Sequence, residues 1–238
     1  MSRRLAAPHG AAPGRIPRSP LGAQRRADAA HAAPACSSAG VRGRSAGSGW
    51  SDRPLGAPSA LRAWLADRGS LTQHLHEASD RLQVRRILQG RGLPCLDEPG
   101  PLQGPGPGRG SGRSRAWLVR EVVLACNGVP AVFAHSVISA EALRGPWRWL
   151  AGLGHRPLGE ALFRDPRIRR GPITYRHLRA PDRRYRSAVA QLAAAGLPTP
   201  ARLWARRSVF AAGGRRLLVT EVFLPVVASL ARPKKGRG

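Results

Sequence analysis

The sequence predicts an α+β protein with a mostly antiparallel sheet, because helical apolar spacing comes first and two β-hairpins follow. Asn127-Gly128 and Gly213-Gly214 each separate two apolar runs of strand length. An Asn-Gly pair favours a two-residue hairpin turn, since both central residues of that turn need positive φ. Hairpin strands are neighbours in the chain and pair antiparallel, so the two hairpins together predict the sheet.

The folded part is expected to cover residues 55–230 as one domain. Residues 1–54 are rich in Ala, Gly, Pro, Ser and Arg, with Asp28 and Asp52 as their only acids. Apolar residues larger than Ala are too sparse there to form a core, so this segment is predicted to be a disordered basic extension. An Arg-rich, acid-poor start also leaves an organellar transit peptide open. Residues 231–238 are predicted to be a basic tail.

The formal charge of +27 and the isoelectric point of about 12.0 first suggest a nucleic-acid partner. However, Lys234 and Lys235 are the only lysines, and the arginines are spread along the whole chain. That distribution favours coding bias over a binding surface, so no nucleic-acid partner is expected, although the field would attract a small polyanionic substrate. No apolar run reaches the ~18 residues that a membrane span needs, which predicts no membrane insertion.

The cysteines, Cys36, Cys95 and Cys126, are odd in number and far apart, and they show no C-x-x-C spacing. This pattern fits neither a disulfide framework nor a zinc site. We therefore expect a reducing compartment, and place the protein in the cytoplasm.

Helical spacing of apolar residues predicts a first helix over residues 58–65, which Gly69 can end. Ser70 and Gln73 have the spacing of a capping box and start a second helix. Apolar residues continue over 84–88, so the helical part is expected to extend through them.

Residues 99–114 are dominated by Gly and Pro, and are predicted to form a flexible linker between the helical part and the sheet. The first hairpin follows, with strands expected over 117–124 and 129–138. Ser139 then caps a short helix that stops at Gly145.

The last part of the chain is predicted to alternate between helix and hairpin. Residues 158–163 form a helical turn, and residues 186–195 form an Ala-rich helix closed by Gly196. The second hairpin pairs residues 203–210 with residues 217–224.

Glu221 occupies the middle of a strand whose two faces are both apolar. Leu217, Val219 and Phe223 share its face, since alternate residues of a strand point the same way. An unpaired carboxylate in such a place would cost on the order of several kcal/mol. Glu221 is therefore expected to be protonated, paired or facing a polar pocket.

Arg120 poses the same problem on an earlier strand, where it shares a face with Leu118, Val122 and Leu124. A buried arginine keeps its proton and favours a carboxylate or phosphate partner. Two interpretations stay open. Arg120 and Glu221 could form a structural salt bridge with each other. They could instead line a closed cavity in which Arg120 binds a substrate carboxylate and Glu221 bonds a hydroxyl or moves a proton.

Other polar residues give weaker indications of function. His135 stands alone on a predicted strand and is expected to be a hydrogen-bonded sheet histidine. His74 and His76 are two residues apart on a predicted helix, so they do not share a face as metal ligands would. The sequence contains no metal or cofactor motif, and no cofactor is expected.

Several segments of the chain resemble the chorismate pyruvate-lyases. They are Trp117–Glu121, Asn127-Gly128, Gly154–Gly159, Leu203–Ser208 and Leu217–Pro225. Their order and approximate spacing agree with that family over roughly residues 58–227. The pattern T-E-x-F-L-P, with L-W-x-R-R-S on the preceding strand, is the specific part of the likeness.

The resemblance implies a sheet of about six mostly antiparallel strands flanked by helices. It also implies conversion of chorismate to 4-hydroxybenzoate and pyruvate, the first committed step of ubiquinone biosynthesis, without a metal or cofactor. The family's ligand-binding arginine falls on Arg120, its glutamate on Glu221, and a leucine whose backbone contacts the ligand on Leu158. A fourth contact, a methionine in some members, falls on Leu71, which is a conservative departure.

In the arrangement implied for chorismate, Arg120 binds a carboxylate, Glu221 bonds the ring hydroxyl, and the backbone at Leu158 supports the ring carboxylate. Whether Glu221 transfers a proton stays open. The alternative is a non-catalytic effector-binding domain of the same fold, as in some transcription regulators. Such a protein needs a DNA-reading winged helix ahead of the domain, which residues 1–54 do not supply. A monomer is expected.

Overall fold

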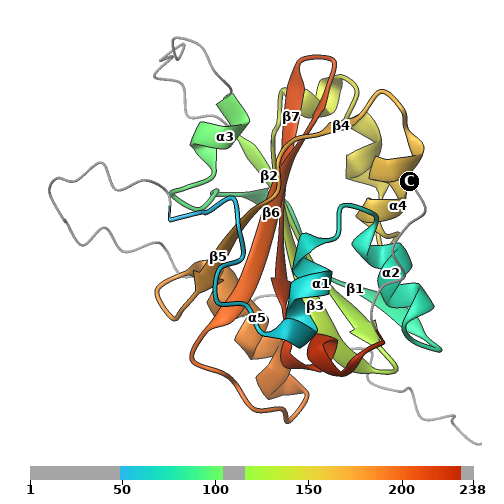
Figure 1. Cartoon of the computed structure of the whole chain (residues 1–238). Coiled ribbons are helices and arrows are strands. Elements are labelled where there is room, and N and C mark those ends of the chain that lie inside the picture. Colours follow the sequence, from blue (N-terminus) through green and yellow to red (C-terminus); the bar gives the residue numbers. More distant parts are fainter. Residues whose placement is uncertain (1–48, 104–115, 232–238) are drawn as a thin grey trace, which may run out of the picture. The chain divides into compact units, whose positions relative to one another are not determined.

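The structure is a computed structural model that describes residues 49–103 and 116–231. Within these ranges the chain forms one seven-stranded sheet with antiparallel neighbours (Figure 1). The strands are β1 Leu82–Gly92, β2 Trp117–Cys126, β3 Val129–Ser139, β4 Arg169–Arg170, β5 Thr174–Leu178, β6 Leu203–Ala212 and β7 Arg215–Phe223. Their order is β1-β2-β3-β7-β6-β4, and β5 also pairs with β6. The predicted α+β class is confirmed.

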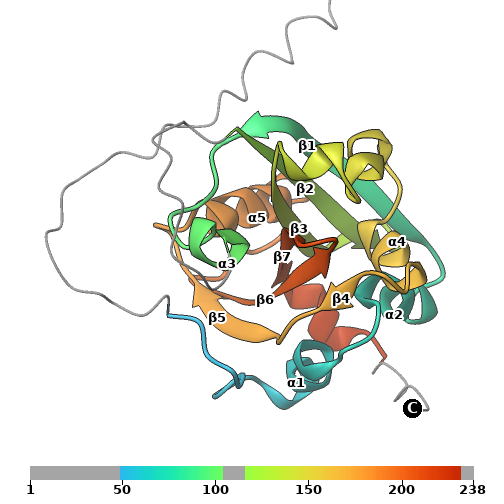
Figure 2. The ribbon, with the colours of Figure 1, turned by 90° about the horizontal axis from the view of Figure 1, so that it is seen from above.

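Helices cover both faces of the sheet (Figure 2). The α-helices are α1 Ser59–Ala66, α2 Leu71–Glu77, α3 Pro99–Gln103, α4 Leu158–Arg164 and α5 Arg183–Ala194. Short 3-10 turns are η1 Ala142–Arg144, η2 Arg148–Gly152 and η3 Pro225–Ser229. The face that carries Arg120 and Glu221, called face A below, is covered by α1, α2 and α4. The opposite face, face B, is covered by α3 and α5.

Both predicted hairpins are confirmed. Asn127 and Gly128 have φ values of 50° and 84°, as the tight turn between β2 and β3 requires. Gly213 and Gly214 have φ values of 52° and 71° between β6 and β7. β3 and β7 then pair with each other, so the two hairpins form the centre of the sheet.

The expected helical continuation over 84–88 is wrong, because these residues belong to β1. The register between β1 and β2 shifts between Arg86 and Leu88. This bulge breaks the alternation by which a strand is recognised in a sequence. Val84 packs with the core of face A, whereas Ile87 packs with the core of face B.

The linker predicted over 99–114 is wrong at its start, because Pro99–Gln103 forms α3. Leu102 of this helix packs on Trp117 and Val119, which gives the short helix its place on face B. Residues 104–115, which complete the predicted linker, lie outside the described residues.

Described residues just before the expected boundary at residue 55 contact the folded part of the chain. Ser51 forms an antiparallel bridge with Tyr175, and the Trp50 indole donates a 2.6 Å hydrogen bond to Asp97. Residues 1–48, most of the predicted extension, and residues 232–238 of the predicted tail lie outside the described residues.

A smaller difference concerns the start of the helix that follows the basic stretch. The predicted helix over 186–195 begins at Arg183, because the Asp182 side chain accepts a hydrogen bond from the Arg184 backbone and caps it. Cys95 and Cys126 are free thiols. None of the helices described is both long enough and apolar enough to span a membrane.

Candidate active site

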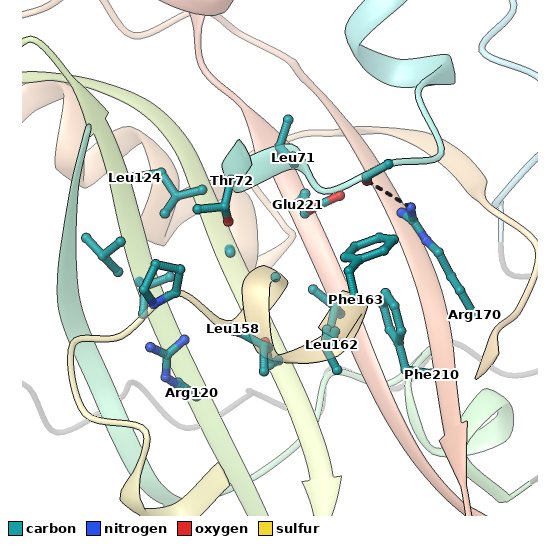
Figure 3. A pocket seen from close by; sticks show the side chains of 18 residues that line it. Leu71, Thr72, Arg120, Leu124, Leu158, Leu162, Phe163, Arg170, Phe210 and Glu221 are labelled. Carbon is teal, nitrogen blue, oxygen red and sulfur yellow. Dashed lines mark hydrogen bonds between the residues drawn. The ribbon is translucent and has the colours of Figure 1, made fainter. Parts of the chain in front are cut away.

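Arg120 and Glu221 approach the same hollow on face A from two strands that flank β3. Arg120 on β2 lies opposite Ser136, and Glu221 on β7 lies opposite Ala134. Ala134 and Ser136 therefore form the floor between the two charges. Because both floor side chains are small, they leave a pocket that Arg120 and Glu221 both line (Figure 3).

Arg120 is only 1% exposed, and it is held by backbone oxygens instead of an acid. Its Nη2 donates to the carbonyl oxygens of Gly154 at 3.1 Å and Arg156 at 3.0 Å. Its Nε is buried without a hydrogen-bond partner, and none of the described carboxylates lies within ion-pair distance. Burial and the nearby Arg86 cation lower the pKa of Arg120 to about 10. The guanidinium is thus a buried cation without a counter-ion in the described part of the chain.

Glu221 does not pair with Arg120, so the structural salt bridge between them is not formed. Its Oε2 accepts a 2.6 Å hydrogen bond from Nε of Arg206. Arg206 also donates to the carbonyl oxygens of Trp64 and Asp67, which anchors it between β6 and the end of α1. Oε1 of Glu221 makes no hydrogen bond with the described residues and is available to a ligand in the pocket.

The starts of α2 and α4 form the wall opposite the sheet. Ser70 caps α2 by accepting a 3.3 Å hydrogen bond from the backbone of Gln73, as the capping-box spacing predicts. Leu71, the first residue of α2, and Leu158, the first residue of α4, both line the pocket. The four positions expected to contact a ligand therefore line one pocket: Leu71, Arg120, Leu158 and Glu221.

Arg170 also lines the pocket, and sequence reasoning missed it. Its Nε donates to the Ser208 hydroxyl at 3.0 Å, and its Nη1 donates to the carbonyl oxygen of Arg68 at 2.8 Å. Nη1 also donates to the carbonyl oxygen of Gly69 at 3.4 Å, the bond drawn as a dashed line in Figure 3. It belongs to β4, which has two residues and no alternation that the sequence could reveal. In a stretch already rich in arginine, nothing in the sequence marks Arg170 out.

Face B carries a second group of charges, called the buried ion cluster below. Its members are Asp97, Glu98, Glu121, His135, Arg183 and Arg184. His135 lies between Glu121, whose Oε1 is 3.0 Å from Nδ1, and Glu98, whose Oε1 is 3.2 Å from Nε2. Burial alone would lower the pKa of His135, but these two carboxylates outweigh it and raise the pKa to about 9. His135 is thus hydrogen-bonded in the sheet, as expected.

Cys95, Glu98 and His135 bring possible metal-ligand atoms within 4.8 Å of one another. However, Glu98 Oε1 already pairs with Nη1 of Arg184 at 3.1 Å, a cation that disfavours a metal ion beside it. Burial, together with the Glu98 carboxylate, raises the pKa of the Cys95 thiol to about 12, which disfavours the thiolate that binds metals. The group is arranged as an ion-pair network.

Comparison with known proteins gives consistent results. The family model described as "Chorismate lyase" matches residues 51–232. Three curated relatives carry the name "Probable chorismate pyruvate-lyase". The Thiobacillus denitrificans protein is 45% identical over 75% of this chain and 90% of its own length. The Nitrosomonas europaea protein is 40% identical over 76% and 96%, and the Cupriavidus pinatubonensis protein is 45% identical over 76% and 88%.

Solved structures that resemble this chain are more distant. PhnF from Mycobacterium smegmatis has a TM-score of 0.47 and 16% identity, over 67% of this chain and 65% of that one. At that distance the likeness does not bear on function. The match of the family model over most of the chain, and the identity to curated relatives along nearly their whole length, do identify the family. This chain belongs to the chorismate lyase family.

Proposed function

We propose that this chain is a lyase that converts chorismate to 4-hydroxybenzoate and pyruvate, the first committed step of ubiquinone biosynthesis. The observation that carries the proposal is Arg120, a buried guanidinium that faces a pocket and has no counter-ion among the described residues. An anionic ligand would supply the partner that such a cation needs. Membership of the family narrows that anion to chorismate.

The proposed pose follows from where the polar groups lie in the pocket. Chorismate carries its ring carboxylate and its hydroxyl on opposite carbons of the ring. We place the ring carboxylate at Arg120 and at the backbone of Leu158, which follows the loop whose carbonyl oxygens hold Arg120. The first N–H groups of a helix lack intrahelical partners, so the start of α4 can donate to this carboxylate. The hydroxyl then reaches Glu221, with Leu71 over the ring.

The reaction breaks the bond between the ring carbon and the ether oxygen of the enolpyruvyl group. The ring carbon that bears the hydroxyl loses its hydrogen as a proton, and the methylene carbon of the departing enolpyruvate gains a proton to give pyruvate. The ring becomes aromatic, so the step is strongly favourable. The enzyme therefore has to hold a reactive conformer and keep water away from it, as an apolar pocket on face A can do.

Two routes are open for the ring proton. Glu221 can accept it through Oε1, or the proton can pass directly to the enolpyruvyl methylene while Glu221 only bonds the hydroxyl. Arg206 holds the Glu221 carboxyl group in one orientation in either case, through the bond to Oε2. A Glu221→Gln variant separates the routes, since glutamine preserves a hydrogen bond to the hydroxyl but cannot take the proton.

The experiment is incubation of the protein with chorismate, followed by ultraviolet detection of 4-hydroxybenzoate and an independent assay of pyruvate. The wild type should form both products in equal amounts. Arg120→Ala should lower kcat/KM by about 100-fold or more, because it removes a buried charged contact. Glu221→Gln should lower kcat by about 100-fold or more if Glu221 transfers the proton, and by much less if it only positions the ring.

The matched control is Arg186→Ala, an exposed arginine on α5 at face B, which should turn over chorismate like the wild type. Unchanged turnover in both site variants would remove the assignment of the site. Binding of chorismate or 4-hydroxybenzoate by the wild type without any turnover would instead support the non-catalytic effector-binding alternative.

A further inference from the structure

We propose that Arg170 binds the second carboxylate of chorismate, the one on the enolpyruvyl side chain, and thereby distinguishes the substrate from 4-hydroxybenzoate. This inference rests on the proposed function and extends it to a residue that family resemblance did not assign. It begins from a mismatch of charge: chorismate is a dianion, whereas the pose above uses one cation, Arg120.

The geometry of chorismate decides where the second carboxylate lies. The enolpyruvyl ether is attached to the ring carbon next to the one that bears the hydroxyl. With the ring carboxylate at Arg120 and the hydroxyl at Glu221, the enolpyruvyl group must emerge at the Glu221 end of the pocket. Arg170 lines the pocket at that end, and Figure 3 shows Arg120 and Arg170 on opposite sides of Glu221.

Arg170 is held in one orientation before a ligand arrives. Its bonds to Ser208 and to the carbonyl oxygens of Arg68 and Gly69 use Nε and Nη1. The Arg170 guanidinium carbon lies 5.7 Å from the ring centre of Phe163 and 5.4 Å from that of Phe210. Cation–π contacts of this length favour one position of the guanidinium.

One edge of Arg170 is left for a ligand. Nη2 makes no hydrogen bond with the described residues, and none of their carboxylates lies within ion-pair distance of this guanidinium. Burial lowers the pKa of Arg170, and the negative charge of Glu221 opposes that effect. The two side chains therefore interact electrostatically across the pocket. A partly buried cation with an unused donor is suited to a carboxylate.

The two arginines then have different tasks in the cycle. The ring carboxylate stays on the product, so Arg120 contacts chorismate and 4-hydroxybenzoate alike. The enolpyruvyl carboxylate departs with pyruvate, so Arg170 contacts the substrate and loses its ligand after the ether bond breaks. Loss of this contact should weaken binding of chorismate and leave binding of 4-hydroxybenzoate almost unchanged.

The test compares wild type, Arg170→Met and Arg170→Lys by chorismate kinetics and by titration with 4-hydroxybenzoate. Arg170→Met should raise the KM for chorismate about 10-fold or more, since a charge-assisted contact is lost. Its Kd for 4-hydroxybenzoate should stay within about threefold of the wild type. Arg170→Lys should recover part of the KM, because it restores the charge without the planar fork.

Arg169→Met is the matched control, since Arg169 is the exposed neighbour of Arg170 on β4. It should leave both ligands unaffected. If Arg170→Met weakens both ligands equally, or leaves the KM for chorismate unchanged, the inference is overturned. An equal loss for both ligands would mean that Arg170 only supports the backbone at Arg68 and Gly69.

Failure of the proposed function gives a different result. If the wild type does not turn over chorismate, the Kd values of chorismate and 4-hydroxybenzoate replace the kinetic constants. A selective loss of chorismate binding in Arg170→Met would then still support the second-carboxylate site. Absence of binding of either ligand to the wild type would overturn both the function and the site.

Discussion

Arg206 lies directly opposite Glu221 across the hairpin of β6 and β7, and its Nε donates a 2.6 Å hydrogen bond to Glu221 Oε2. The same guanidinium donates to three carbonyl oxygens at the end of α1, those of Trp64, Leu65 and Asp67. Arg206 therefore ties the end of α1 to the sheet and also orients the Glu221 carboxylate.

Replacing Arg206 with methionine should lower the free energy of unfolding by about 3 kcal/mol, because Glu221 loses its counter-ion in a largely buried place. Urea denaturation measures this change. The double variant with Glu221→Gln should recover part of the loss, since no charge is then left unpaired. The exposed Arg202→Met is the control and should stay within about 0.5 kcal/mol of the wild type. A single variant as stable as that control would show that the pair is dispensable.

The stability of the protein should fall between about pH 6.5 and pH 9 because of His135. Its pKa rises from 6.5 to about 9 on folding, so folding is favoured fully below pH 6.5 and the gain is lost as the pH rises through 9. The loss should be on the order of 3 kcal/mol. Charged groups around it are Glu98, Glu121, Arg183 and Arg184.

Urea denaturation at a series of pH values tests this linkage. His135→Gln should be less stable than the wild type at pH 6.5, and its stability should be nearly flat up to pH 9. Above pH 9 both proteins should lose stability, because burial raises the pKa of the Cys95 thiol from 9.0 to about 12. An equal pH slope in both proteins between pH 6.5 and 9 would rule out His135 as its source.

Gly159→Ala should impair the pocket, because α4 packs tightly on the start of α2. A Cβ at this position would lie 2.9 Å from the Thr72 hydroxyl and 3.3 Å from the Ser70 hydroxyl. Overpacking of this kind costs about 1–3 kcal/mol, and here it would displace two walls of the site. A cost of this size corresponds to a kcat/KM for chorismate that is about 10-fold lower, which steady-state kinetics would measure. Adding Thr72→Ala should restore part of it, and no recovery would place the strain elsewhere.

Gly128→Val should lower stability without altering the site, since the turn between β2 and β3 needs a left-handed backbone there. Gly128 has a φ of 84°, and an added Cβ would meet no atom within 4 Å, so the cost is that of the backbone alone. We expect a loss of about 1–2 kcal/mol. Thermal unfolding measures it. Gly90→Val is the matched control and should not show this loss, because a Cβ at Gly90 also meets no atom within 4 Å but the backbone there is not left-handed. A stable Gly128→Val protein would contradict the turn assignment.

Local sequence signals predicted the centre of the fold. The two hairpin turns demand positive φ at their glycines, and apolar alternation defines the strands around them. That alternation also exposed Arg120 and Glu221 as charges in apolar strands. The sequence also allows Glu221 to be paired with Arg206, because the two residues are equally far from the turn at Gly213-Gly214 and so lie opposite each other in the hairpin.

The missed features depend on contacts that are distant in the chain. β1 is irregular at its bulge, and β4 is too short to show a period, so neither strand nor Arg170 could be recognised. Glu98 lies in a loop, and its ion pair is with His135 on β3, which is distant in the sequence. These features depend on contacts between residues that are far apart in the sequence, and local residue spacing does not predict such contacts.

A crystal structure of the protein with 4-hydroxybenzoate tests the central claim most directly. We predict the ring between the sheet and the starts of α2 and α4, with its carboxylate within hydrogen-bond distance of Arg120 and its hydroxyl within hydrogen-bond distance of Glu221. Ligand bound elsewhere with these two side chains untouched, or bound in the pocket with neither in contact, would contradict the proposed site.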